Sequence, residues 1–152
     1  MDEMLDQLGQ TIVAALGGAA REHSVTRGEL TVLAQARDIV AVVTFLREDP
    51  RCLFYSIIDI TAVDWPGRER RFDVVYHFLS PKQNFRIRIK VETDEVTPVP
   101  SIIGVFRGAD WFEREIYDLL GVLFDGHPDL RRILLPDDWE GHPLRKSYTE
   151  ID

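Results

Sequence analysis

One stretch with a strict period of two constrains the fold of this chain more than any other feature. Between positions 85 and 92, apolar side chains alternate with charged ones. The apolar positions are Phe85, Ile87, Ile89 and Val91, and the charged positions are Arg86, Arg88, Lys90 and Glu92. Successive side chains of a strand point to opposite faces of its sheet, so this stretch predicts an antiparallel strand with one buried face. The basic positions of the other face can attract an anion, but we favour simple solvation.

Two more apolar segments precede this strand and complete an antiparallel meander. Residues 52–63 are rich in Ile, Leu and aromatic side chains, and the turn-forming sequence DWPG follows them. Residues 71–79 form the next segment, which ends at Ser80 and Pro81. Strands joined by short turns pair antiparallel with their neighbours. A further short strand is expected at residues 29–34.

Helical spacing of apolar residues occurs in three places. It predicts helices over residues 4–16, 37–48 and 101–121. Asp110 and Glu113 have the spacing of a capping box, so Asp110 is the expected N-cap of the last helix. Helices packed on a mostly antiparallel sheet make an α+β domain, and a long irregular C-terminal segment is expected to follow it.

Composition excludes several classes of function. The chain has 152 residues, the size of one ordinary domain, and a formal net charge of −8, which argues against a nucleic-acid partner. Its single cysteine, Cys52, can form no internal disulfide, and an iron–sulfur cluster takes about four such ligands. The N-terminal residues do not resemble a targeting segment. The longest apolar run is less than half of the roughly 20 residues that span a bilayer.

The C-terminal residues 125–152 have a composition unlike the rest. Pro128, Pro136 and Pro143, together with Gly126 and Gly141, prevent a long helix or a central strand. The same segment is too apolar to be a free tail, so it must satisfy its amides against a surface. We therefore expect an α+β domain over residues 1–124 and an extended segment over residues 125–152. The segment either wraps its own domain or lies on a partner, and its aromatic and arginine side chains favour a partner.

Two groups of polar residues allow alternative functions. His127 and His142, with a nearby carboxylate, are the residue types of a two-histidine metal site in a small metal-dependent enzyme. They are about fifteen residues apart in irregular chain, so we favour polar residues positioned in turns. Glu113 and Glu115 flank Arg114, but consecutive helical positions point about 100° apart, so the three cannot converge on one small substrate. They suit a charged stripe at an interface.

Several motifs resemble, in order, the C-subunit family of respiratory complex I, the proton-pumping NADH:quinone oxidoreductase. The most specific are EREIYDLLGV at 113–122, GHPDLRRIL at 126–134 and GHPLRK at 141–146. Upstream, DITAVD at 59–64, FDVVYH at 72–77 and VPS at 99–101 are also similar to blocks of that family. Leu120 stands where many relatives carry Phe. The resemblance covers about two thirds of the chain.

The resemblance implies a hydrophilic subunit of the peripheral arm, without a catalytic site and without a bound cofactor. Flavin and iron–sulfur clusters would belong to partner subunits. The D subunit, which holds the quinone site, and the B subunit, which bears a cluster, are the implied partners. Membrane association at the cytoplasmic face of the inner membrane would come only through the complex. The equivalent subunit of a membrane-bound hydrogenase remains an alternative. The expected interface residues are Glu113, Arg114, Glu115, Asp118, His127, Asp129, Arg131, Arg132, Trp139, His142, Arg145, Lys146 and Tyr148.

Overall fold

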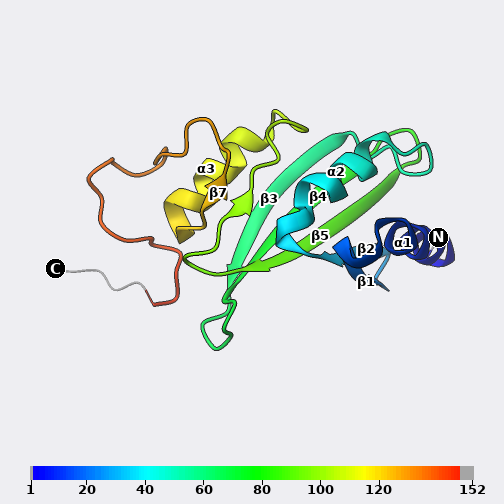
Figure 1. Cartoon of the computed structure of the whole chain (residues 1–152), viewed down its shortest axis with the longest axis horizontal. Helices are drawn as coiled ribbons and strands as arrows, with labels where there is room; N and C mark the ends of the chain where they lie inside the picture. Colours follow the sequence, from blue (N-terminus) through cyan, green and yellow to red (C-terminus); the bar gives the residue numbers. More distant parts are fainter. Residues whose placement is uncertain (1, 148–152) are drawn as a thin grey trace.

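A five-stranded mixed sheet and three α-helices form the fold (Figure 1). A computed structural model describes residues 2–147 of the chain. The helices are α1 (Asp2–Leu16), α2 (Ile39–Glu48) and α3 (Ala109–Leu120). The strands of the sheet are β1 (Ala20–Thr26), β2 (Glu29–Ala34), β3 (Ser56–Asp64), β4 (Phe72–Ser80) and β5 (Phe85–Thr93). Two short strands, β6 (Val99–Pro100) and β7 (Phe124–Asp125), pair in parallel outside it.

The strand order of the sheet is β1-β2-β5-β4-β3. Strands β3, β4 and β5 pair antiparallel in sequence order, which confirms the predicted meander. β2 joins the free side of β5 in parallel, and β1 pairs antiparallel with β2, so one of the four pairings is parallel. The α+β fold with a mostly antiparallel sheet is therefore confirmed.

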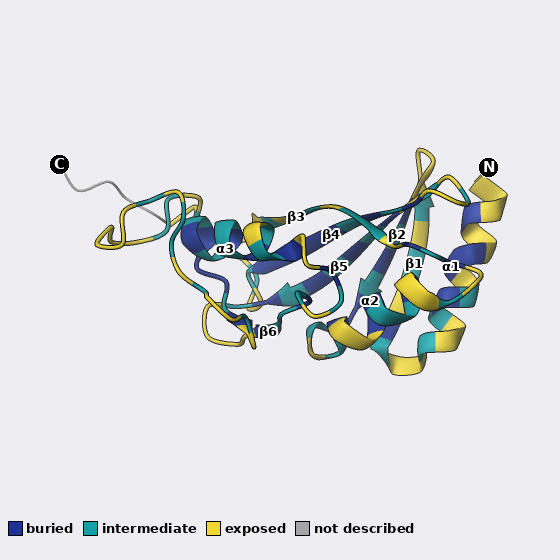
Figure 2. Ribbon diagram, turned by 90° about the horizontal axis from the view of Figure 1, so that it is seen from above, coloured by how far each residue is buried: buried dark blue, intermediate teal, exposed yellow. Residues whose placement is uncertain are grey.

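The core lies between one face of the sheet and the helices. The register places Tyr76 opposite Ile89 and Phe78 opposite Ile87, so the apolar positions of β4 and β5 share a face. Buried side chains of all three helices belong to the same apolar cluster as this face. In Figure 2 the buried positions follow the strands and the inner sides of the helices. The opposite face of the sheet carries the charged positions of β5.

The structure corrects three details of the predicted elements. Strand β1 was not expected, because its residues are mostly polar and show no apolar alternation. The last helix begins at Ala109 rather than at residue 101, since turns and irregular backbone occupy residues 101–108. Its N-cap is Gly108 and makes no side-chain cap bond, so the expected capping box is wrong. Glu113 points into the core instead.

The chain beyond β7 runs in turns and irregular backbone through residue 147, as predicted. In Figure 1 it leaves α3 as a wide loop and returns toward the sheet near the turn between β3 and β4. Within residues 2–147, the helices are all too short or too polar to cross a bilayer.

Candidate partner interface

Asp118 ties the C-terminal segment to the end of α3. Its side chain has no accessible surface, and its Oδ2 accepts backbone N–H groups from Leu134 at 2.7 Å and Leu135 at 3.0 Å. Arg132 donates from Nη1 to Oδ1 at 2.9 Å. Burial acts to raise the pKa of Asp118, but these hydrogen bonds outweigh it and hold the pKa below its usual range. The carboxylate is thus ionised and fully committed inside the chain.

A second group of contacts closes the C-terminal end of α3. Gly121 ends the helix in the left-handed conformation, with φ of 78°. His142 lies 3.0 Å from the backbone carbonyl of Asp118, so its Nδ1 carries the proton and donates. Arg145 donates to the carbonyl of Leu120, and the Leu144 amide donates to that of Leu119. The segment therefore satisfies the carbonyls that a helix end leaves open.

Gly121 is required for this arrangement on two counts. Its positive φ disfavours any side chain. A Cβ at this position would also lie 2.3 Å from Nη2 of Arg145 and 2.7 Å from Cδ2 of His142. The helix end and the segment can approach this closely only because residue 121 has no side chain.

The far end of the described segment is held by Asp64, the last residue of β3. Arg71 donates to both carboxylate oxygens of Asp64, at 2.8 and 2.7 Å, in a bidentate pair. The Lys146 amide donates to the same carboxylate at 2.8 Å, and Arg71 also reaches Ser147 Oγ at 3.2 Å. Hydrogen bonds from Arg71 lower the pKa of Asp64 despite its burial. Residues 82 positions apart are thereby joined.

Glu113 is a buried carboxylate near the start of α3. It accepts a hydrogen bond from Ser101 Oγ at 2.6 Å and one from the Ile102 amide at 2.9 Å. Burial raises the pKa of Glu113, and these two bonds offset only part of the effect. Glu113 therefore fixes the loop that precedes α3. Because it has no exposed surface, its expected role as a direct partner contact is corrected to an internal one, and the same holds for Asp118.

His127 packs against the first turn of α3. Its side chain is fully buried, and its Nδ1 accepts the Asp129 amide at 3.0 Å. In the neutral ring the proton is then on Nε2, which lies 3.0 Å from Asp110 Oδ1 without the alignment of a hydrogen bond. Arg114 is 3.9 Å from the same oxygen. His127 thus contacts the N-terminal end of α3, whereas His142 contacts its C-terminal end.

This placement contradicts the metal-enzyme alternative. His127 contacts Asp110 and His142 contacts Asp118, and eight residues of helix separate those positions by about 12 Å. The two imidazoles cannot share one ion in this arrangement. No cluster of three histidine, cysteine or acidic side chains suited to a metal occurs in the described part of the chain either.

The remaining predicted interface residues lie at or near the surface. Glu115 is half-buried on α3, Arg131 forms an ion pair with Asp129, and Lys146 stacks over the Trp65 ring. Tyr148 lies outside the described residues. Three large apolar side chains of the segment are exposed in part, although the backbone amides of Leu134 and Leu144 are bonded to α3. They are Leu134 (49% exposed), Trp139 (37%) and Leu144 (58%).

Two alternatives were expected for the segment, wrapping its own domain or binding a partner. The backbone of the segment fits the first alternative, and its exposed side chains fit the second. Its backbone is held by its own domain at Asp118, at the end of α3 and at Asp64. Residues 2–147 cover its exposed apolar side chains only in part. Sequence reasoning missed Asp64, Arg71 and Ser101 as anchors. The role of Gly121 had one signal in the sequence, which is its position directly after an apolar helix.

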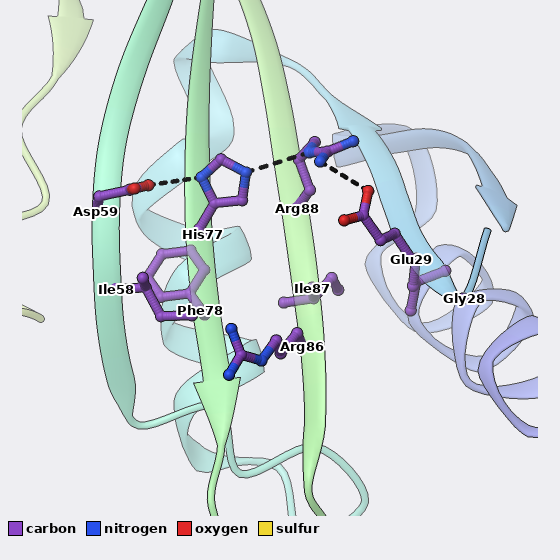
Figure 3. A pocket seen from close by; sticks show the side chains of 10 residues that line it. Gly28, Glu29, Ile58, Asp59, His77, Phe78, Arg86, Ile87 and Arg88 are labelled. Carbon is purple, nitrogen blue, oxygen red and sulfur yellow. Dashed lines mark hydrogen bonds and ion pairs between the residues drawn. The ribbon is translucent and has the colours of Figure 1, made fainter. Parts of the chain in front are cut away.

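A polar row crosses the open face of the sheet (Figure 3). Arg88 donates from Nε to His77 Nε2 at 3.2 Å, so the proton of the neutral His77 ring is on Nδ1. Nδ1 then donates to Asp59 of β3 at 2.6 Å. Arg88 also donates to Glu29 at 2.9 Å. A hollow of about 280 Å³ with Arg86 on its rim adjoins the row. Arg88 is therefore internally paired, in line with a solvated, structural face rather than an anion site.

Comparison with known proteins identifies the family. The model of the "respiratory-chain NADH dehydrogenase, 30 Kd subunit" family matches residues 32–151. Proteins named as the C subunit of NADH-quinone oxidoreductase are similar over nearly the whole chain. The relative from Xanthobacter autotrophicus is 60% identical over 97% of this chain and 71% of its own length. That from Methylobacterium radiotolerans is 57% identical over 97% and 68%.

A solved structure shares the fold. A chain in the membrane-bound sulfane sulfur reductase, described as an archaeal respiratory membrane complex, superposes with a TM-score of 0.78 at 25% identity. The match covers 95% of this chain and 85% of that one. The sequence motifs, the fold and these similarities agree. The chain belongs to the 30-kDa subunit family of the respiratory-chain NADH dehydrogenase, which is the C-subunit family of NADH-quinone oxidoreductase.

Proposed function

We propose that this chain is a non-catalytic scaffold in the peripheral arm of a proton-translocating NADH:quinone oxidoreductase. It holds the quinone-site D subunit and the cluster-bearing B subunit in position. The observation that carries this proposal is the C-terminal segment, whose backbone is anchored while Leu134, Trp139 and Leu144 face outward. Anchored backbone keeps such side chains in place at little further entropic cost, which favours tight binding.

The chemistry of the polar residues supports a structural role. Asp64, Glu113 and Asp118, the most buried acids with resolved partners, all bind backbone amides or side chains of this chain. A carboxylate committed in this way is a poor general base, because its lone pairs are already occupied. Electron transfer through flavin and iron–sulfur clusters would therefore take place in partner subunits.

Cys52 gives further support for a chain without a cluster. It is the only cysteine in the sequence and is buried. Burial raises the pKa of its thiol to about 11, whereas a metal or cluster ligand must be a thiolate. Cys52 thus acts as a small apolar core residue.

The proposed location is the cytoplasmic face of the inner membrane, with attachment only through the other subunits. The relatives named above and the archaeal structure belong to respiratory complexes, and the latter is described as a membrane complex. A second candidate, the equivalent subunit of a membrane-bound hydrogenase or related complex, is favoured by that structural similarity alone. Identity near 60% to C-subunit proteins favours the NADH:quinone enzyme.

Deletion and complementation test this function. Membranes from cells that lack the chain should lose NADH:quinone activity and regain it when the gene is restored. The isolated chain should not oxidise NADH with a soluble quinone analogue, because the scaffold has no electron carrier. Unchanged NADH:quinone activity in membranes without the chain would refute the proposal.

A further inference from the structure

The outer side of β3 is the less protected edge of the sheet. β3 pairs with β4 only and forms one end of the sheet. Its sequence, SIIDITAVD, contains no lysine, arginine or proline, and its two acids are paired within this chain, Asp59 with His77 and Asp64 with Arg71. The other edge strand, β1, reads AREHSVT. Soluble proteins usually protect such edges with charge or proline, since an unpaired edge recruits further strands. An edge like that of β3 suits pairing within an assembly.

The hydrogen-bond register shows which backbone groups are available. The Trp65 amide donates to the Arg71 carbonyl, one step beyond the last paired residues of β3 and β4, so the amide of Trp65 points toward β4. Alternate residues of an antiparallel strand point their N–H and C=O groups to opposite sides. Thr61 and Val63 therefore face β4, and Ile60 and Ala62 face away from it. Within residues 2–147, β3 has no second strand partner for these groups.

A groove runs along this edge, between β3 and α3. Figure 1 shows α3 beside β3, at the end of the sheet. Their approach is close at the beginning, where a Cβ on Gly108 would lie 3.2 Å from Ile57 Cγ2. Farther along, a hollow of about 150 Å³ opens between them. Its lining consists of Ile60, Thr61 and Ala62 from β3, Glu115, Ile116, Leu119 and Leu120 from α3 and its end, and Leu144.

The groove is mostly apolar, and its only charged lining residue is an acid. Glu115 lies on its helical wall and has no ion-pair partner among the described residues. Leu144, which is 58% exposed, also lines the hollow and belongs to the C-terminal segment. Trp111 is four residues before Glu115, on the same side of α3, and is also largely exposed. The free strand edge is thus continuous with the apolar surface proposed for partner binding.

We propose that this groove accepts an extended segment of a partner subunit, which adds to β3 as a further strand. The segment bonds to the outward backbone groups of Ile60 and Ala62 and places a small apolar side chain in the hollow. It carries a lysine or arginine opposite Glu115. Strand addition draws affinity from main-chain bonds and specificity from such side-chain sites. This inference rests on the proposed function, because it assumes that the chain is assembled with other subunits.

Hydrogen exchange of the unaltered chain tests the strand directly. The isolated chain is compared with the NADH:quinone oxidoreductase complex purified from membranes through a tag on this chain. The amides of Ile60 and Ala62 should exchange at least about tenfold more slowly in the complex, while ladder amides such as Thr61 are protected in both. Equal exchange at these two amides in a complex that contains the partner subunits would overturn the inference and leave the proposed function intact.

Other occupants have distinct signatures. Protection that appears in the isolated chain and rises with its concentration would mean a second copy of the chain, and this would overturn the proposal. Protection in the isolated chain that is independent of concentration would mean residues 148–152 of the same chain and would overturn it equally. A tagged chain that purifies without any partner subunit would refute the proposed function and this inference with it.

Substitutions give an independent readout. Ala62→Pro removes one outward N–H, so the isolated chain should fold with a nearly unchanged Tm but be recovered in the complex at least about tenfold less. Thr61→Pro removes a ladder bond and should lower the Tm. Glu115→Lys should also weaken recovery, whereas the matched Glu22→Lys on β1, at the opposite edge of the sheet, should not. Normal recovery of both Ala62→Pro and Glu115→Lys would contradict strand addition.

Discussion

Arg132 and Asp118 hold the C-terminal segment against the end of α3 through two hydrogen bonds from one nitrogen. Nη1 of Arg132 donates to the carboxylate of Asp118 at 2.9 Å and to its backbone carbonyl at 3.1 Å. Nη2 donates to the Gly141 carbonyl at 2.7 Å, farther along the segment. One guanidinium therefore links the helix end to both limbs of the loop between residues 132 and 141.

Removal of the Asp118 charge should destabilise the whole chain. Asp118→Asn leaves Arg132 without its buried counter-ion and replaces one acceptor oxygen with a donor that faces backbone N–H groups. Loss of one partner of a buried pair costs about 3–5 kcal/mol, so the free energy of unfolding should fall by roughly that amount. Urea unfolding measures it. Asp125→Asn, at an exposed position, is the control and should have little effect.

Comparison of two glycine variants should separate the effect of backbone strain at position 121 from the effect of crowding there. Gly121→Ala and Gly126→Ala both place a side chain at a positive φ, of 78° and 81°, which costs roughly 1–2 kcal/mol at each. Only at 121 does the new Cβ meet Arg145 and His142. Gly121→Ala should therefore also release the segment, seen as faster proteolytic cleavage between residues 126 and 147. Equal cleavage in both variants would show that the contact is unimportant.

Docking of the segment should weaken in mild acid because of His142. Burial lowers the pKa of His142, and the neighbouring Arg145 and Arg132 add to this effect. As the pH falls, the His142 ring of the unfolded or undocked chain therefore binds a proton at a higher pH than the docked ring does. Stability is fully present above the ordinary histidine pKa of about 6.5 and is lost as the pH falls through the lower folded pKa. Hydrogen exchange at the Leu144 amide should accelerate as the pH falls from about 7.5 to about 5.5, after correction for intrinsic rates. A neutral His142→Asn variant should show no such acceleration.

The buried carboxylate of Glu113 should tolerate an amide far better than a truncation. Burial raises the pKa of Glu113, so ionisation of Glu113 weakens the fold as the pH rises toward that pKa. Glu113→Gln keeps acceptor and donor atoms for the Ile102 amide and Ser101 and should change the free energy of unfolding by about 1 kcal/mol or less. Glu113→Ala leaves a cavity and an unpaired buried amide, and should cost about 3 kcal/mol. Urea unfolding of both variants gives the two values. A larger loss in the glutamine variant than in the alanine variant would exclude this role.

Local patterns predicted those elements whose stability is local. The alternation at 85–92 located β5 within one residue, and the apolar segments before it located β3 and β4, because each has one face in the core. β1 gave no such pattern because it is a polar edge strand, mostly exposed. The parallel pairing of β2 with β5 joins residues nearly 60 positions apart and leaves no trace in either sequence.

The interface residues were the hardest to assign, because the type of a residue does not show whether its side chain points into the core or outward. Glu113 and Glu115 differ by two positions, yet one is buried and the other faces the groove beside β3. The spacing of Asp110 and Glu113 fitted a capping box, but Ser101 and Ile102 supply the partners that draw Glu113 inward. The sequence around Asp64 predicts a turn residue. It gives no sign of the hydrogen bond that the Lys146 amide donates to the Asp64 carboxylate.

Affinity purification from native membranes tests the central claim most directly. A tagged wild-type chain should retrieve the homologues of the D and B subunits. A chain with Leu134→Ser, Trp139→Ala and Leu144→Ser should lose them while it remains folded, because these side chains are exposed. The control Met4→Ser, at a 57% exposed apolar residue of α1, should retain both partners. Retrieval of neither partner by the wild-type chain would contradict the account.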